Sequence, residues 1–216
     1  GKSTNNKKNI KLNIILLTTK TYHHLHFYRE ISKNFKNMKV IIEKKKINFG
    51  FKIKHKLYDN RDKYEKKFFF QNKNYLFKQV KSFQNVNSNK CSKYINNENP
   101  DIIICFGIGI LKKKFLKFFK SKIIVNLHGG NPTEYRGLDS FFWSIYHNDF
   151  ANLISTLHYV DNRIDTGKII DSKKIFITKK TKLEHLRAIN TLICVELVKK
   201  FLTKIKRKKK IKSSNN

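Results

Sequence analysis

Short apolar runs alternate along the chain with segments of helical periodicity, and this alternation constrains the fold more than any other feature. The runs 13-NIILLTT-19, 101-DIIICFG-107 and 122-KIIVNLH-128 are rich in Ile and Val and predict buried strands. An apolar stripe that begins at Leu25 predicts a helix over 21–36. Strand–helix alternation of this kind favours a three-layer, Rossmann-like α/β domain with a mostly parallel, open sheet.

The remaining expected elements follow the same pattern. We expect further strands at 38–43, 153–160 and 168–177, and helices at 59–83, 91–97, 110–119, 138–148 and 181–203. The chain is then one domain over 11–203, between a disordered basic N-terminus at 1–10 and a basic tail at 204–216. The tail is interpreted as a solubility feature, with a weak phosphate contact as the alternative.

Ligands of open parallel sheets bind beyond the carboxyl ends of the strands, so the site is expected just after residues 19, 106 and 127. His23 and His24 follow the first of these strands. They are candidates for substrate contact, and capping or packing of the first helix is the alternative. Gly1-Lys2-Ser3-Thr4 matches the end of a phosphate-binding P-loop, but no strand or glycine loop precedes it, so that interpretation is rejected.

The segment 124–145 carries the strongest chemical signal. Asn126 and His128 are two residues apart at a strand end, so both side chains leave the same face of the sheet, and Asp165 follows in another loop. An amide N–H and an imidazolium can both donate to the oxygen of a tetrahedral intermediate, and a carboxylate favours the imidazolium. These residue types suit acyl transfer to an amine, although Asn and His at a strand end are more often structural hydrogen-bonding groups.

Two motifs in the expected order add a resemblance to this pattern. The stretch 126-NLHGGNPTEYRG-137 resembles the active-site segment of the folate-dependent formyltransferase superfamily, and 162-NRIDTGKII-170 is similar to its Leu-Asp-x-Gly element, with Ile164 in place of Leu. The strand and turn 101-DIIICFGIGIL-111 also resembles that family's strand before the folate-binding loop. The resemblance implies that Asn126, His128 and Asp165 are catalytic.

The resemblance further implies N10-formyltetrahydrofolate as the formyl donor, with no metal. The donor's pterin would lie against the backbone of two segments, and the residues assigned to it are Ile108, Gly109, Ile110, Leu111, Val160, Asp161 and Ile164. Arg136 is interpreted as an anchor for a substrate anion, or as a partner of a carboxylate such as Glu134. The aromatic residues at 141–143 are expected in the core.

Departures from the family pattern bear on the acceptor. The segment 17-LTTKTYHHLHF-27 lacks the glycine-rich phosphate loop of phosphoribosylglycinamide formyltransferase, and no room is left after the last helix for the second domain of methionyl-tRNA formyltransferase. The Gly-Gly-Asn-Pro loop at 129–132 looks closer to sugar-nucleotide N-formyltransferases. We therefore expect a small amine acceptor, an amino-sugar nucleotide first, with those two enzymes as alternatives. A nucleic-acid-binding protein on a degenerate scaffold is the non-enzymatic alternative, but all three catalytic residue types are intact.

Charge and cysteine content limit the remaining classes. The net charge of +33 would attract polyanions, but its lysines are spread along the whole chain, so nucleic-acid binding beyond nonspecific attraction is not expected. Cys91, Cys105 and Cys194 have no metal-binding spacing and indicate a reducing, cytoplasmic compartment. No apolar run approaches the roughly 18 residues of a membrane span, so no membrane partner is expected. A homodimer is left open.

Overall fold

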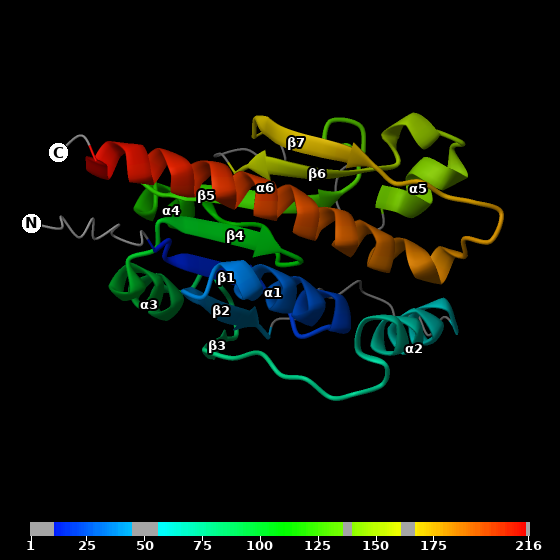
Figure 1. The fold of residues 1–216 in the computed structure, drawn as a ribbon, viewed down its shortest axis with the longest axis horizontal. Coiled ribbons are helices and arrows are strands. Elements are labelled where there is room, and N and C mark those ends of the chain that lie inside the picture. The colour runs from blue at the N-terminus through cyan, green and yellow to red at the C-terminus, as the bar shows by residue number, and fades with distance from the viewer. Residues whose placement is uncertain (1–10, 45–55, 136–139, 161–166, 215–216) are drawn as a thin grey trace, which may run out of the picture.

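A seven-stranded sheet forms the centre of the molecule in the computed structural model, which describes residues 11–44, 56–135, 140–160 and 167–214. The strand order is β3-β2-β1-β4-β5-β6-β7 (Figure 1). The strands are β1 (Ile14–Thr18), β2 (Met38–Glu43), β3 (Val80–Phe83), β4 (Ile102–Phe106), β5 (Ile123–Gly129), β6 (Ile154–Tyr159) and β7 (Ile169–Lys174). The first five are parallel, and β6 and β7 each run antiparallel to the neighbour before them. The predicted open, mostly parallel α/β sheet is confirmed.

Helices cover both faces of this sheet. They are α1 (Tyr22–Asn34), α2 (Lys56–Phe70), α3 (Asn89–Glu98), α4 (Lys113–Phe118), α5 (Ser140–Tyr146) and α6 (Leu186–Ser214), with 3-10 turns η1 (Phe150–Asn152) and η2 (Leu183–His185). Helices α1 and α6 lie side by side over one face (Figure 1). Helices α3 and α4 supply the buried residues that cover the other face.

Strand β1 shows why the sheet needs helices on both faces. Ile14 and Leu16 pack into the cluster under α1 and α6, whereas Ile15 and Leu17 pack into the cluster under α3 and α4. Successive side chains of a strand point to opposite faces, so a run of four buried apolar residues has to be covered from both sides.

Local chemistry fixes several helix ends, the first two close to the carboxyl edge of the sheet. Thr21 caps α1, and its Oγ1 accepts a hydrogen bond from the backbone N–H of His24 at 3.3 Å. Ser88 caps α3 in the same way through the N–H of Cys91. Helix α3 ends at Asn99, which adopts a left-handed φ of 43° before Pro100.

The predicted helix over 59–83 is wrong in its second half. Helix α2 stops at Phe70, because Gln71 and Asn72 turn the backbone with φ values of 51° and 62°, and the chain then runs on to β3. Strand β3 is four residues long, mostly exposed and at the edge of the sheet. It therefore lacks the run of buried apolar residues that indicates a strand in a sequence.

The predicted basic tail is also helical for most of its length, because α6 continues from Leu186 through Ser214 instead of ending near residue 203. Its last turns lie against the amino edge of the sheet, where Lys209 Nζ bonds both carboxylate oxygens of Asp101 at 2.8 and 2.9 Å. No helix in the described ranges, α6 included, combines the length and apolarity that a membrane span requires. The expected disordered segment 1–10 lies outside the described residues.

Candidate active site

Strand β5 carries Asn126 and His128 to the carboxyl edge of the sheet, next to the end of β4. Cys105 of β4 is the register partner of Asn126. Ile124, two residues before Asn126, packs into the cluster under α3 and α4, so Asn126 and His128 leave the sheet on that same side. Both side chains are partly exposed, whereas Val125 before them and Leu127 between them are buried. The sequence prediction of a shared face is confirmed by this register.

The side chain of Asn126 contacts a buried histidine on the next strand. His158 of β6 lies directly opposite Asn126 in the antiparallel register, and Nδ2 of Asn126 is 3.2 Å from Nε2 of His158. Nδ1 of His158 is 2.9 Å from the carbonyl oxygen of Tyr159. The sequence reasoning did not single out His158, which is the last of four consecutive buried residues in β6.

The loop after β5 folds back over His128. Nε2 of His128 lies 2.8 Å from the carbonyl oxygen of Tyr135 and 3.3 Å from Oγ of Ser140. A carbonyl oxygen only accepts hydrogen bonds, so Nε2 of His128 carries a proton. The contact places a proton donor at the end of β5, directly under the loop that follows this strand.

Two glycines make this close approach feasible. A Cβ on Gly129 would lie 2.0 Å from the ring of Phe141, and a Cβ on Gly130, whose φ is 144°, would lie 2.7 Å from Cβ of Ser140. The carbonyl of Gly130 accepts a hydrogen bond of 3.0 Å from Thr156 of β6. Side chains at either position would push α5 away from His128.

A second loop, after β4, lies on the same side of the sheet. Ile108, Leu111 and Val160 all pack into the cluster that contains Ile124. The N–H of Val160 donates to the carbonyl of Ile124 at 2.9 Å. Both segments that the family resemblance assigns to the donor therefore adjoin the face that bears Asn126 and His128.

Glu43 and Asn87 hold the loop after β4 in place. Glu43, buried at the end of β2, accepts hydrogen bonds from the backbone N–H groups of Gly109 at 3.0 Å and Val86 at 3.1 Å. Asn87 donates to the carbonyl of Ile110 and accepts from the N–H of Lys112. Neither residue was predicted as part of the site, and the available signal was a lone acidic residue at the end of an apolar strand.

His23 and His24 lie at the start of α1 with both rings buried. Nδ1 of His23 is 2.9 Å from Oγ1 of Thr21, and Nδ1 of His24 is 3.0 Å from Oγ1 of Thr19. Burial lowers the pKa of His24 to about 3 and holds the pKa of His23 well below its usual value, so both rings are neutral near pH 7. These contacts are those of capping and packing, and their role in substrate binding stays a prediction.

Beside these histidines, a buried carboxylate joins three elements. Glu65 of α2 receives two hydrogen bonds from Arg187 of α6, Nε to Oε1 at 2.6 Å and Nη2 to Oε2 at 2.8 Å. Its Oε2 also lies 3.7 Å from Nδ1 of His23. Burial raises the pKa of Glu65, and the Arg187 guanidinium opposes that rise. These contacts join α1, α2 and α6 near the carboxyl end of β1.

Four of the predicted site residues lie outside the described residues: Asp165, Arg136, Asp161 and Ile164. Their roles remain predictions. In the part of the chain that the structure describes, no group of three His, Cys, Asp or Glu side chains is arranged to hold a metal ion.

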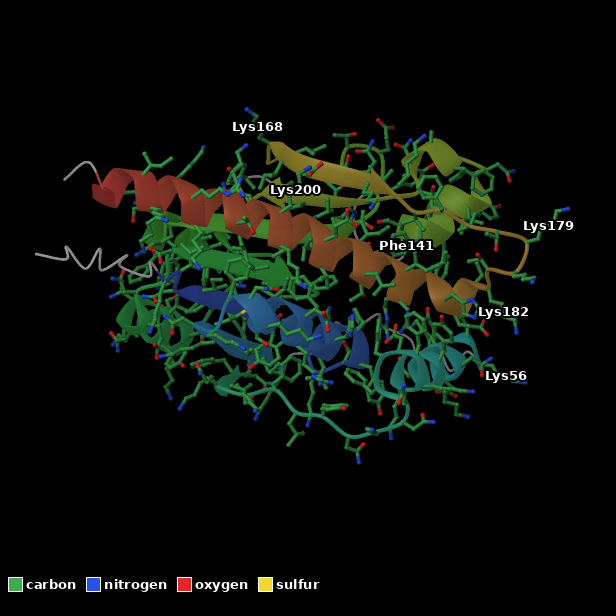
Figure 2. The ribbon with its side chains drawn as sticks, in the orientation of Figure 1. Lys56, Phe141, Lys168, Lys179, Lys182 and Lys200 are labelled. Carbon is green, nitrogen blue, oxygen red and sulfur yellow. The ribbon has the colours of Figure 1, made fainter. Side chains whose placement is uncertain are left out.

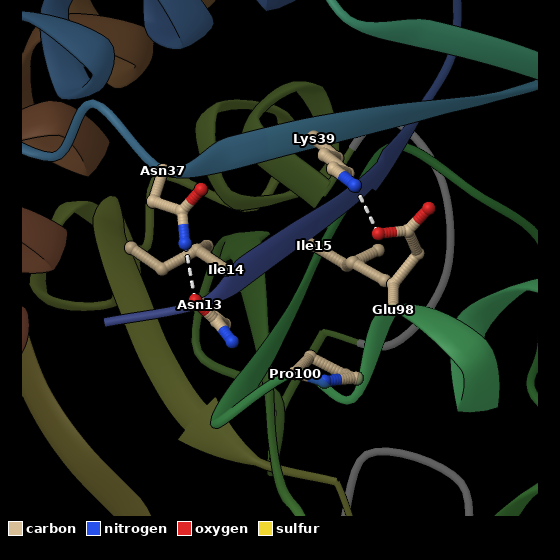
Figure 3. Close-up of a pocket in the computed structure, with 7 residues that line it drawn as sticks. All are labelled: Asn13, Ile14, Ile15, Asn37, Lys39, Glu98 and Pro100. Carbon is tan, nitrogen blue, oxygen red and sulfur yellow. Dashed lines mark hydrogen bonds and ion pairs between the residues drawn. The ribbon is translucent and has the colours of Figure 1, made fainter. Parts of the chain in front are cut away.

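A small recess at the opposite edge of the sheet is separate from this site. It measures about 160 Å³ and is lined by Asn13, Ile14, Ile15, Asn37, Lys39, Glu98 and Pro100 (Figure 3). Its polar side chains are already paired, Asn37 with Asn13 and Lys39 with Glu98. The recess is at the amino ends of β1 and β2, away from Asn126 and His128.

Fold and site together define a Rossmann-like α/β protein with amide and imidazole side chains at the carboxyl end of a central strand. The sequence model of the family described as formyl transferase matches residues 12–190, so the chain belongs to the formyl transferase family. The resemblance seen in the sequence motifs is thereby confirmed.

Curated relatives share part of this chain. A methionyl-tRNA formyltransferase from Finegoldia magna is 28% identical over 120 residues, which are 55% of this chain and 38% of the relative. The enzyme of the same name from Thermodesulfovibrio yellowstonii is 28% identical over 116 residues, 53% of this chain and 37% of the relative. The matches thus span less than two fifths of the length of these relatives.

Solved structures show the same fold at low sequence identity. Phosphoribosylglycinamide formyltransferase from Streptococcus pneumoniae superposes with a TM-score of 0.61 at 14% identity, covering 89% of this chain and 99% of that one. A sugar N-formyltransferase candidate from Mycobacterium tuberculosis gives 0.62 at 17% identity, covering 91% and 68%. At these identities the likeness concerns the fold alone.

Proposed function

We propose that this chain transfers a formyl group from N10-formyltetrahydrofolate to the primary amine of a small substrate. The observation that carries the proposal is the placement of Asn126 and His128 on the sheet face that Ile108, Leu111 and Val160 adjoin. Family membership supports the reaction type and the donor. An amino-sugar nucleotide is our first choice of acceptor, on the strength of the Gly-Gly-Asn-Pro loop at 129–132.

We place the pterin of the donor against the backbone of the loop after β4. Its backbone is held from one side by Glu43 and Asn87, and a Cβ on Gly109 would meet only Oε2 of Glu43, at 3.7 Å. The apolar side chains of Leu111 and Val160 flank this backbone. When bound there, the donor supplies an activated formyl carbon.

The chain's own residues then stabilise the transfer. The amine nitrogen bonds to the formyl carbon, and the carbonyl oxygen gains the negative charge until the bond from carbon to N10 breaks. Asn126 donates an N–H to that oxygen, and the protonated imidazole of His128 adds a second donor. Asp165 is expected to favour the imidazolium and to accept, through water, the proton that the amine loses, and that proton passes on to N10 of the departing tetrahydrofolate.

An assay of tetrahydrofolate release and formylated product tests the proposal. His128→Ala and Asp165→Asn should each lower kcat by about 10² to 10³, because the first removes a donor to the oxyanion and the second removes the carboxylate that keeps this donor protonated. His185→Ala is the matched control, because His185 is in η2 and stacks on Tyr64 of α2, away from β5. This substitution should leave kcat within about twofold of wild type. Turnover within about threefold of wild type in His128→Ala or Asp165→Asn contradicts the assigned roles.

The acceptor is tested by running amino-sugar nucleotides, phosphoribosylglycinamide and methionyl-tRNA in parallel with one folate donor. We expect the highest kcat/KM with an amino-sugar nucleotide. A clear preference for either other acceptor replaces our choice and leaves the roles of Asn126 and His128 unchanged.

A further inference from the structure

His158 is a buried polar residue that no element of the proposed reaction uses. Its side chain is 2% exposed, and β6 places it directly across from Asn126. Its ring bridges two groups, with Nδ1 2.9 Å from the carbonyl oxygen of Tyr159 and Nε2 3.2 Å from Nδ2 of Asn126. Burying an imidazole costs free energy unless both ring nitrogens find partners, and these two contacts supply them.

The contact with Tyr159 determines the tautomer of His158. A carbonyl oxygen is only an acceptor, so Nδ1 carries the proton. In the neutral ring Nε2 is then an unprotonated acceptor, which matches the N–H of the Asn126 carboxamide. The opposite orientation of Asn126 would set its oxygen against the lone pair of Nε2. The orientation of the Asn126 carboxamide is therefore determined by the tautomer of His158.

We propose that His158 is a positioning residue that orients Asn126 for catalysis; this inference rests on the proposed formyl transfer. One N–H of the carboxamide is bound to His158, and the second N–H is thereby held in a fixed direction in the amide plane. Without His158 the carboxamide can rotate and present its oxygen, which would repel the oxyanion. Donors that are fixed before the reaction stabilise the transition state without reorganisation.

Two substitutions separate this role from a purely structural one. His158→Gln places its terminal amide near the position of Nε2 and retains an acceptor for Asn126. His158→Asn is shorter, retains a polar group near Tyr159, and leaves no atom within reach of Asn126. We expect His158→Asn to lower kcat by about 10- to 100-fold, the scale of an ångström-sized misplacement, with the KM for the donor within about twofold. His158→Gln should stay within about fivefold of wild type.

A double-mutant cycle identifies the partner. In the Asn126→Ala background, His158→Asn should have almost no further effect on kcat, because the group that it orients is absent. Equal losses in His158→Asn and His158→Gln at equal melting temperature, or effects that multiply with Asn126→Ala, would overturn the proposal.

A measurement on the wild-type protein is independent of activity. The ¹⁵N shifts of the His158 ring should show a protonated Nδ1 and an unprotonated, hydrogen-bonded Nε2 at pH 7.5. A protonated Nε2 would overturn the inference. If the wild type transfers formyl to none of the acceptors, the proposed function fails, and the tautomer still decides whether His158 orients Asn126.

Discussion

Gly107 follows β4 in a backbone conformation with a φ of 75°, directly against a buried ring of α1. A Cβ at this position would lie 2.2 Å from Cε1 and 2.4 Å from Nε2 of His24. The close approach fixes the start of the loop at 107–111. At the residue scale, the site is therefore shaped by backbone and buried rings that a substrate need not touch.

Gly107→Ala should lower the free energy of unfolding by about 2–4 kcal/mol, because it combines a left-handed backbone with an overlap against His24. Gly109→Ala is the matched control, since its Cβ meets only an ordinary contact, and should cost less than about 1 kcal/mol. Urea unfolding of both variants measures the difference. Equal stability of the two variants would contradict the expected overlap.

His24 makes stability depend on pH. Its pKa is lowered by burial to about 3 in the folded state, below the ordinary value of 6.5. The unfolded chain therefore binds the proton more readily, so the stability is full above pH 6.5 and is lost as the pH falls towards 3. The loss approaches about 1.4 kcal/mol per pH unit below 6.5 for this one group.

His24→Phe should reduce that slope by the same amount when urea unfolding is compared at pH 7.5, 6 and 5. The change in slope is the measurement, because the substitution also alters packing at every pH. Glu65, whose pKa is raised, is present in both proteins and cancels in the comparison. An unchanged slope would show that His24 does not titrate on unfolding.

At the scale of elements, α2 is tied to α6 through Arg187, whose guanidinium bonds both oxygens of the buried Glu65 and one oxygen of the exposed Asp62. Arg187→Met should cost about 3–5 kcal/mol, because it removes the cation that bonds both oxygens of the buried Glu65 carboxylate. Asp62→Asn, the matched control at the same guanidinium, should cost about 0–1 kcal/mol.

Glu65→Gln in the Arg187→Met background should recover part of the loss, because it removes the buried charge that Arg187 stabilises in the wild type. Thermal and urea unfolding of the four proteins provide the comparison. Equal effects of Arg187→Met and Asp62→Asn would mean that burial of Glu65 does not decide the energy of this contact.

At the scale of the whole molecule, the charge is the dominant surface property. The chain has 48 Lys and Arg against 15 Asp and Glu. Figure 2 shows labelled lysines pointing outward from separate parts of the chain, including Lys56 of α2, Lys168 before β7 and Lys179 after β7. Positive charge distributed in this way attracts any polyanion without selecting a sequence.

We expect binding to duplex DNA or uncharged tRNA to be sequence-independent and to collapse between roughly 50 and 200 mM salt. Formylation of a small amine should change far less over the same range. Filter binding with aminoacylated and uncharged initiator tRNA at 150 mM salt measures this. Retained binding with a clear preference for the aminoacylated form would instead favour a tRNA acceptor.

The sequence by itself determined the sheet class, because strands such as β1 and β4 are buried on both faces and show it as continuous apolar runs. It also placed Asn126 and His128 at the carboxyl edge, since strand period and the parallel-sheet rule are local properties. The two sequence motifs at 126–137 and 162–170 were sufficient to indicate the family. Strand β3 escaped prediction, because an exposed four-residue edge strand has no such pattern.

Only the tertiary structure decided which distant side chains support these residues. His158 meets Asn126 across 32 positions, and Glu43 reaches Gly109 across 66. The two residues of each pair are much farther apart in the sequence than one period of a helix or strand, so no local pattern predicts the contact. The first contact requires that β5 pairs with β6. The second requires that the end of β2, which carries Glu43, lies near the loop after β4. Both depend on the order of strands in the sheet. That order is a property of long-range packing, which is why the groups that contact Asn126 and Gly109 appear only in the folded molecule.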